Sequence, residues 1–230
     1  MQSTYAARLG RIQWTMVMAA VLALAAMLLP LHATAQAARA APVAQPKPAN
    51  TVLVLGDSLS AAYGLAPSQG WVALTAARMS KTNPGWRVMN ASISGETTAG
   101  GAARIEGELK RVRPKVVVIA LGANDGLRGL PLAQTRANLD RMIRAAKQGG
   151  ARVLLVGMRM PPNYGRDYTQ GFEANYGALA KQESVALVPF LLEPVAADRA
   201  NFQADNLHPV ASAQPKIRDH VWKGLSPLLK

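Results

Sequence analysis

Residues 52–55 form a run of four aliphatic side chains that leads directly into Gly56-Asp57-Ser58. An apolar run that stops abruptly at turn residues is typical of a strand buried on both faces of a parallel sheet. The sequence therefore predicts a tight turn that exposes the Ser58 hydroxyl at the sheet edge and places its N–H at the start of a helix. Such a hydroxyl can attack a carbonyl carbon, and such an N–H can hold the resulting oxyanion. In the alternative interpretation, Ser58 only caps that helix.

Strand-forming runs alternate with helical segments along the rest of the chain. Further strands are expected near residues 86–90, 115–121, 152–157 and 185–189, and helices near 69–79, 99–111, 131–148, 171–183 and 211–222. This alternation favours a parallel sheet with helices on both faces. The predicted fold class is α/β, a three-layer α/β/α sandwich around a five-stranded parallel sheet of flavodoxin-like order 2-1-3-4-5.

In a sheet of this order, ligands bind beyond the carboxyl ends of the first and third strands, where the strand order reverses. Ser58 follows the first strand, and Gly122-Ala123-Asn124-Asp125 follows the third. We therefore expect Ser58 and Asn124 to face the same crevice. The Asn124 amide is a candidate oxyanion donor, although asparagine is also common in left-handed turns. Gly95, in the loop after the second strand, is a candidate for a further N–H donor.

A serine nucleophile needs a base, which is most often histidine. Of the three histidines, His32 lies within the predicted signal peptide over residues 1–37, and His220 is expected on the solvated side of the last helix. This leaves His208, which has Asp205 three residues before it on the same side of a turn. A carboxylate placed there can fix the imidazole tautomer and stabilise its cation. The alternative is an aspartate-capped turn with a surface histidine.

The first residues have the pattern of a secretory signal peptide. Two arginines precede an apolar segment over residues 14–31, and an Ala-x-Ala site follows at residues 35–37. The alternative is an uncleaved anchor, because the apolar segment is close to the length that spans a bilayer. The expected organisation is a signal peptide over 1–37 that is cleaved near Ala37, a flexible leader over 38–50 and one folded domain over 51–230. The mature protein is expected to be periplasmic or secreted.

The composition limits the partners of the chain. It carries 26 Lys and Arg against 13 Asp and Glu, a net charge of +13, which becomes +11 without residues 1–37 because these hold two arginines and no acid. Such a charge suits anionic substrates or a membrane surface, but no basic run or basic-aromatic stripe marks a nucleic-acid site. Without cysteine the chain has no disulfide and no lipoprotein anchor. We expect no metal, no cofactor and no nucleic acid.

Four blocks of the sequence, taken in order, resemble those of the GDSL or SGNH hydrolase family. They are Gly56-Asp57-Ser58-Leu59-Ser60, Gly95, Gly122-Ala123-Asn124-Asp125 and Asp205-Asn206-Leu207-His208. Loops over residues 90–95, 124–129 and 162–165 resemble the periplasmic branch of multifunctional acyl-CoA thioesterases, lysophospholipases and arylesterases. Ala123 and Glu96 depart from that branch, which often has glycine and aspartate at these positions.

The resemblance implies the chemistry of a serine hydrolase. Ser58 would be the nucleophile, His208 the general base and Asp205 the residue that orients the base. The N–H groups of Ser58 and Gly95 and the side chain of Asn124 would form the oxyanion hole. The familiar Gly-x-Ser-x-Gly elbow is absent, because Ser60 occupies its last position.

The expected function is that of an exported serine esterase or thioesterase. It would hydrolyse aryl esters, acyl-CoA-type thioesters and lysophospholipids through an acyl-enzyme. The expected substrate contacts are Asp57 and Leu59 beside Ser58, together with Met160, Pro162 and Tyr164. The last three lie in the loop over residues 157–169, which is apolar and suits fatty chains, although apolar residues of this kind can also serve only to pack the loop. We expect a monomer that takes small acyl esters or thioesters and contacts membrane surfaces transiently. The alternatives are a carbohydrate O-acetylesterase on the same scaffold and a non-catalytic lipid-binding protein.

Overall fold

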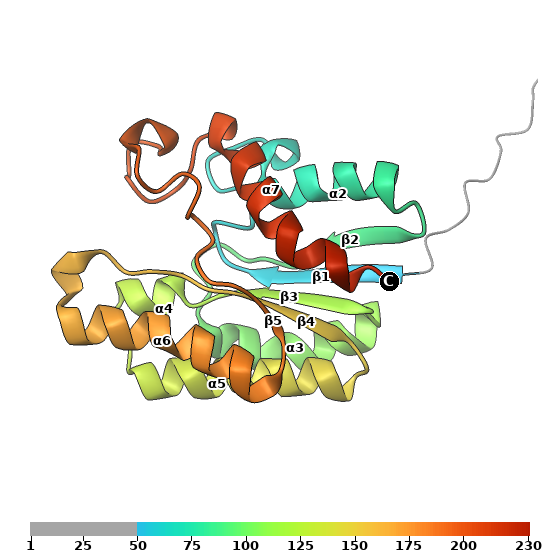
Figure 1. Cartoon of the computed structure of the whole chain (residues 1–230), viewed down its shortest axis with the longest axis horizontal. Coiled ribbons are helices and arrows are strands. Elements are labelled where there is room, and N and C mark those ends of the chain that lie inside the picture. The colour runs from blue at the N-terminus through green and yellow to red at the C-terminus, as the bar shows by residue number, and fades with distance from the viewer. Residues whose placement is uncertain (1–49) are drawn as a thin grey trace, which may run out of the picture. The chain divides into compact units, whose positions relative to one another are not determined.

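The computed structural model describes residues 50–230, which fold around one parallel sheet (Figure 1). Its strand order is β2-β1-β3-β4-β5, so the predicted order 2-1-3-4-5 is confirmed. The strands are β1 (Asn50–Gly56), β2 (Trp86–Asn90), β3 (Val116–Ala120), β4 (Arg152–Val156) and β5 (Ala186–Val188). The predicted signal peptide and nearly all of the predicted leader lie outside the described residues.

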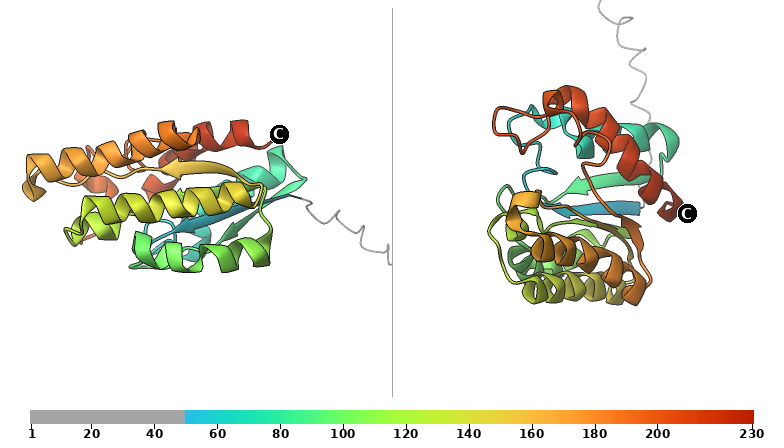
Figure 2. Two further views of the ribbon diagram at one scale, coloured as in Figure 1. Left: turned by 90° about the horizontal axis from the view of Figure 1, so that it is seen from below. Right: turned by 60° about the vertical axis from the view of Figure 1, so that its left-hand side comes forward.

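Helices cover both faces of the sheet and make it the middle of three layers (Figures 1 and 2). One face carries α2 (Trp71–Thr82) and α7 (Gln214–Leu225), and the other carries α3 (Thr98–Val112), α5 (Leu132–Gln148) and α6 (Arg166–Glu183), with the short α4 (Ala123–Leu127) at the end of β3. Single 3₁₀ turns lie at Pro67–Gln69, Pro162–Tyr164, Arg199–Asn201, Ala211–Ala213 and Ser226–Leu228. Among residues 50–230, no helix combines the length and apolar character that crossing a membrane requires.

The two central strands are buried on both faces, which explains their continuous apolar runs. Val52 and Val54 of β1 pack with α2 and α7, whereas Leu53 and Leu55 pack with α3, α5 and α6. β3 alternates in the same way, and its register pairs Gly56 with Ala120. The carboxyl ends of β1 and β3 are therefore level, so the segments that follow them start side by side.

The structure corrects the prediction that a helix begins at Ser58. The chain turns instead, with the N–H of Ala61 bonded to the carbonyl of Asp57 at 2.9 Å and the N–H of Tyr63 to the carbonyl of Ser58 at 3.2 Å. Ala62 has a φ of +60°, a left-handed conformation that no right-handed helix can contain. The helix α2 starts only at Trp71.

Two further boundaries differ from the sequence prediction. The segment after β3, expected as a loop, contains the five-residue helix α4, because Gly122 has a φ of +121° and turns the chain into it. The helix α6 begins at Arg166, five residues before the expected start at 171. Gly171 therefore lies inside the helix, where its small size accommodates the side chain of Leu132.

We expect Gly122→Ala to lower the free energy of unfolding by about 2–4 kcal/mol, because it combines backbone strain with overpacking. A Cβ at this position would lie 2.1 Å from the hydroxyl oxygen of Tyr176. The control is Gly177→Ala in α6, where a Cβ meets nothing within 4 Å; this change should stabilise the helix by up to about 1 kcal/mol. Urea unfolding of both variants measures the difference, and equal stabilities would contradict the strain assigned to Gly122.

Candidate active site

Ser58, His208 and Asp205 form a chain of hydrogen bonds beyond the carboxyl end of β1. The Oγ of Ser58 lies 2.8 Å from the Nε2 of His208, whose Nδ1 lies 2.7 Å from the Oδ2 of Asp205. A carboxylate only accepts hydrogen bonds, so it holds the proton of a neutral imidazole on Nδ1. The Nε2 lone pair is then directed at the hydroxyl of Ser58 and can accept its proton.

A tight turn holds Asp205 and His208 in this geometry. The Oδ1 of Asp205 accepts the N–H groups of Leu207 and His208 at 2.9 and 3.0 Å, while Asn206 between them has a φ of +61°. These backbone N–H groups, that of His208 first, lower the pKa of Asp205 to about 2. The group is therefore a carboxylate throughout the range in which a histidine base works.

Tyr63 forms a contact that the sequence did not predict. Its ring lies against the His208 imidazole, with 4.5 Å between ring centroids and 38° between planes. The turn after Ser58 brings it there, because the Tyr63 N–H bonds to the Ser58 carbonyl. An aromatic ring at this distance limits rotation of the imidazole.

Asn124 and Gly95 approach the site from two other segments. Asn124 lies in the first turn of α4, and its Nδ2 donates to the carbonyl of Glu96 at 3.0 Å. One of its two amide hydrogens remains for another acceptor. The N–H groups of Ser58 and Gly95 bond to no protein acceptor within residues 50–230. Asn124 lines the same cavity as Ser58, and it is not the left-handed turn residue of the alternative interpretation.

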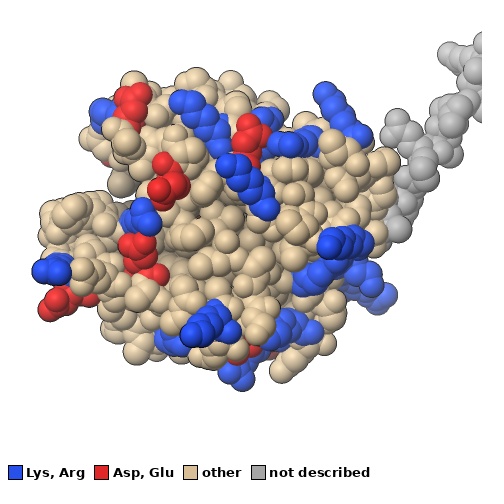
Figure 3. Space-filling view, viewed as in Figure 1, with Lys and Arg blue, Asp and Glu red and all other residues tan. Residues whose placement is uncertain are grey.

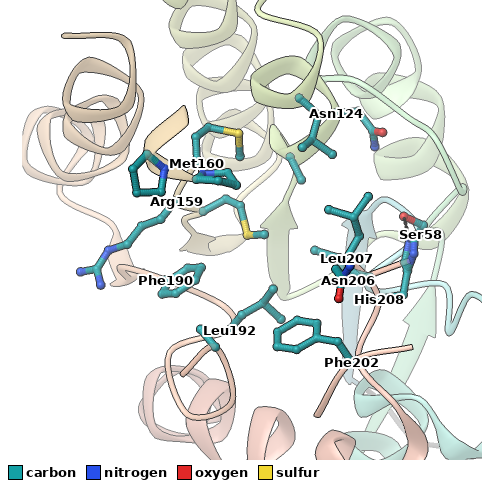
Figure 4. A pocket seen from close by; sticks show the side chains of 17 residues that line it. Ser58, Asn124, Arg159, Met160, Phe190, Leu192, Phe202, Asn206, Leu207 and His208 are labelled. Atoms are coloured by element: carbon teal, nitrogen blue, oxygen red, sulfur yellow. Dashed lines mark hydrogen bonds between the residues drawn. The ribbon is translucent and has the colours of Figure 1, made fainter. Parts of the chain in front are cut away.

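A cavity of about 430 Å³ opens beside Ser58 and His208. Figure 4 shows it running from these two residues toward Met160 and Phe190, with Asn124 along one side. Figure 3 shows the molecule hollowed at its left-hand edge, toward which the strands in Figure 1 point. Apolar side chains form most of the lining. The cavity therefore suits a chain of methylene groups that ends in a reactive carbonyl at Ser58.

The expected substrate contacts divide into two groups. Leu59, Met160 and Pro162 line the cavity. Tyr164 does not line it, and its hydroxyl donates to the carbonyl of Leu127 at 3.0 Å. Asp57 also lies outside the cavity: it is buried beneath the turn, where its Oδ1 accepts the Leu59 N–H at 3.0 Å. Tyr164 and Asp57 therefore support neighbouring backbone segments and do not form the cavity wall.

The sequence predicts only part of the far wall of the cavity, the loop over residues 157–169. This wall comes from the segments after β4 and β5, and it includes Arg159, Phe190, Leu192, Ala196 and Phe202. No motif marks these positions, because apolar residues of this kind are as common in a core as in a cavity. Arg159 pairs with Glu173 at 2.7 Å and Glu193 at 3.1 Å, so it ties α6 to the segment after β5.

His220 was expected to be solvated, and the structure corrects this. It is half-buried, and its Nε2 lies 2.9 Å from the carbonyl of Phe190. It makes no contact with Ser58, which leaves His208 as the serine's partner. Within the described part of the chain, no three His, Cys, Asp or Glu side chains are grouped closely enough to hold a metal ion.

Residues 54–214, which contain all four sequence blocks, match the GDSL-like lipase/acylhydrolase family. The chain belongs to this family. Esterase TesA of Pseudomonas aeruginosa is 52% identical over 181 residues, which cover 79% of this chain and 90% of that protein. Thioesterase 1/protease 1/lysophospholipase L1 of Escherichia coli K12 is 44% identical over 182 residues, with 79% and 86% covered.

Solved structures agree with this assignment. The crystal structure of TesA matches at a TM-score of 0.76 and 51% identity, and it covers 78% of this chain and 99% of that one. Its likeness extends over the sheet and both helical layers described here. The GDSL-like family and these relatives make the protein a hydrolase of ester or thioester bonds. The sequence-level assignment to the GDSL or SGNH hydrolases is confirmed.

Asp57 provides a test of the electrostatics beneath the site. Burial raises its pKa to about 6 from an ordinary value of 3.8, so folding disfavours its charged form. The destabilisation grows as pH rises from about 4 to 6 and is complete above pH 6, where it is on the order of 2–3 kcal/mol. Asp57→Asn keeps the acceptor for Leu59 and should therefore raise the free energy of unfolding at pH 8 but not at pH 4.

Urea unfolding at the two pH values measures this difference. The matched control is Asp205→Asn, because the pKa of Asp205 is lowered and its charged form is the one that folding favours. That variant should lose stability at pH 8. If Asp57→Asn raises the free energy of unfolding equally at both pH values, the gain does not come from removing the carboxyl charge, and the prediction is wrong.

Proposed function

We propose that the protein is a serine esterase and thioesterase that works through an acyl-enzyme on Ser58. The observation that carries the proposal is the 2.8 Å approach of the Ser58 Oγ to the Nε2 of a histidine whose other nitrogen is held by a carboxylate. The serine oxygen forms a bond to the substrate carbonyl carbon, and its proton moves to His208. Asp205 orients the imidazole and stabilises the cation that forms.

The reaction then needs hydrogen-bond donors for the oxyanion and a step that hydrolyses the acyl-enzyme. The N–H groups of Ser58 and Gly95 and the Asn124 amide would bind the carbonyl oxygen as it gains charge. Collapse of the tetrahedral intermediate expels the alcohol or thiol, which takes the proton from His208. Water attacks the acyl-Ser58 carbonyl, His208 accepts its proton, and the acid leaves while Ser58 regains its hydrogen.

The apolar cavity supports acyl chains of medium or long length as substrates. Met160 and Pro162 would contact the chain, with Leu59 close to the carbonyl end. Aryl esters, acyl thioesters and lysophospholipids are proposed because the relatives are named as an esterase, a thioesterase and a lysophospholipase. A carbohydrate O-acetylesterase would instead need polar groups for a sugar, and the lining of this cavity offers few.

We also propose that residues 1–37 are a signal peptide and that the mature enzyme works in the periplasm or outside the cell. The basic start, the apolar segment and the Ala-x-Ala site support this. The mature enzyme would be a monomer that contacts membrane surfaces transiently. Intact-mass measurement on exported protein should give a chain that starts near Ala38, and full-length protein in the inner membrane would contradict export.

A panel of substrates tests the proposed reaction. Aryl esters and acyl thioesters of several chain lengths are compared with lysophospholipid and acetylated sugar. Activity on medium and long acyl chains should exceed activity on acetyl groups. Ser58→Ala and His208→Gln should remove nearly all turnover, whereas the control His220→Gln should retain it. Preference for acetylated sugar would favour the O-acetylesterase instead.

A separate prediction concerns Asn124. Its amide would act on charge that develops only in the transition state, so its loss should affect kcat rather than KM. Asn124→Ala should lower kcat by roughly 10²–10³-fold at nearly constant KM. Steady-state kinetics with an aryl ester measures both constants. A raised KM at unchanged kcat would make Asn124 a substrate-binding or structural residue.

A further inference from the structure

The loop that carries Gly95 is held in place by side chains from two helices. Arg104 of α3 donates to the carbonyl of Ala91 at 2.6 Å, and Arg128, just after α4, donates to the carbonyl of Gly95 at 3.1 Å. The carbonyl of Glu96 accepts from Asn124. Every one of these contacts uses a loop carbonyl, and the Gly95 N–H is left without a protein acceptor within residues 50–230.

Arg104 holds both ends of this loop at once. Besides the Ala91 carbonyl, its guanidinium binds both carboxylate oxygens of Glu96, with the Nε bond to Oε1 at 2.7 Å. The Glu96 side chain is only 7% exposed and that of Arg104 only 21%. A bidentate pair with so little water around it fixes geometry far better than an exposed pair does. The planar fork of arginine is needed to reach three acceptors together.

The conformation of Gly95 makes this restraint matter. Its φ is +80°, and a Cβ there would meet nothing within 4 Å, so no packing around the residue itself sets the direction of its N–H. The direction depends on how the neighbouring carbonyls are anchored. Glycine visits many conformations with little cost, and a loop of this kind would otherwise point its N–H in several directions.

We propose that Arg104 is a positioning residue for the oxyanion hole. By holding Ala91 and Glu96, it directs the Gly95 N–H toward the oxygen of the tetrahedral intermediate at Ser58. The inference rests on the proposed function, since it assigns Gly95 a part in binding the oxyanion. Arg104 does not touch the substrate, because it lies on α3 behind the loop and lines no part of the cavity.

The same helix provides a matched control. Arg111 of α3 forms an ion pair with Glu108, but its side chain is 56% exposed and it touches no part of the Gly95 loop. Glu108 also lies 3.6 Å from Arg104, so Arg111→Met changes this outer ion pair and leaves the contacts of Arg104 with Ala91 and Glu96 in place. If Arg104 only stabilised its helix, Arg104 and Arg111 variants would differ in stability alone. A positioning role instead predicts a selective loss of transition-state binding in the Arg104 variants.

The experiment uses the mature protein with Arg104→Lys, Arg104→Met, Glu96→Gln and Arg111→Met. For each variant, kcat and KM are measured with an aryl ester, together with the thermal midpoint. The inhibition constant of an alkyl trifluoromethyl ketone is also measured. This ketone adds the Ser58 Oγ to its carbonyl carbon, passes the serine proton to His208 and places an oxyanion in the hole without releasing a product. It therefore reports oxyanion binding apart from later steps.

Arg104→Met and Arg104→Lys should lower kcat by roughly 10- to 100-fold with little change in KM. A misplaced hydrogen-bond donor can lose nearly as much transition-state stabilisation as a missing one. The trifluoromethyl ketone should bind more weakly by a similar factor. Arg111→Met should leave all three constants unchanged. Arg104→Lys keeps the charge and provides the test if Arg104→Met fails to fold. The kcat and the ketone affinity of Glu96→Gln should lie between those of wild type and Arg104→Met.

Unchanged kcat and ketone inhibition in folded Arg104→Lys would overturn the inference. So would a loss confined to the thermal midpoint, or an equal loss in Arg111→Met. Failure of the proposed function gives a different result: wild-type protein would hydrolyse no ester, and Ser58→Ala would not differ from it. The positive control Asn124→Ala shows that the assay detects loss of an oxyanion donor.

Discussion

The hydrogen bond between His208 and Ser58 joins side chains that are 150 positions apart in the sequence. It exists because β1 is buried on both faces and ends at Gly56, level with the end of β3, so the Ser58 turn has one fixed place at the sheet edge. The turn at Asp205 then only has to reach that place from the other end of the chain. A shift of either segment by one residue would separate the nucleophile from its base.

Two carboxyl groups near this bond have opposite environments. Asp205 accepts two backbone N–H groups and has its pKa lowered, so it serves the imidazole as a constant negative charge. Asp57 is buried under the same turn and has its pKa raised, so it reduces stability at neutral pH while its oxygen shapes the chain around Ser58. The buried Asp57 carboxyl therefore lowers the free energy of unfolding while it holds the turn that carries the nucleophile, a combination that is common at functional sites.

The sequence predicted the sheet order and the convergence of Ser58 and Asn124, because strand periodicity and the crevice rule for parallel sheets can be applied to the sequence pattern. It predicted His208 by elimination among three histidines and by the three-residue spacing from Asp205. It could not predict what depends on a single backbone angle, such as the left-handed Ala62 in the turn after Ser58. Part of the far cavity wall was also missed, since Phe190 and Phe202 look like core residues. Arg104 looked like any helix-surface charge until its contacts with the Gly95 loop were known.

The central claim is that Ser58 carries the acyl group during turnover. Rapid acid quenching of the mature enzyme with a long-chain p-nitrophenyl ester, followed by peptide mass spectrometry, tests it most directly. The peptide containing Ser58 should gain the mass of the acyl group, with no gain in the Ser58→Ala variant. An acyl group found on another side chain, or turnover that persists in Ser58→Ala with no adduct, would contradict it.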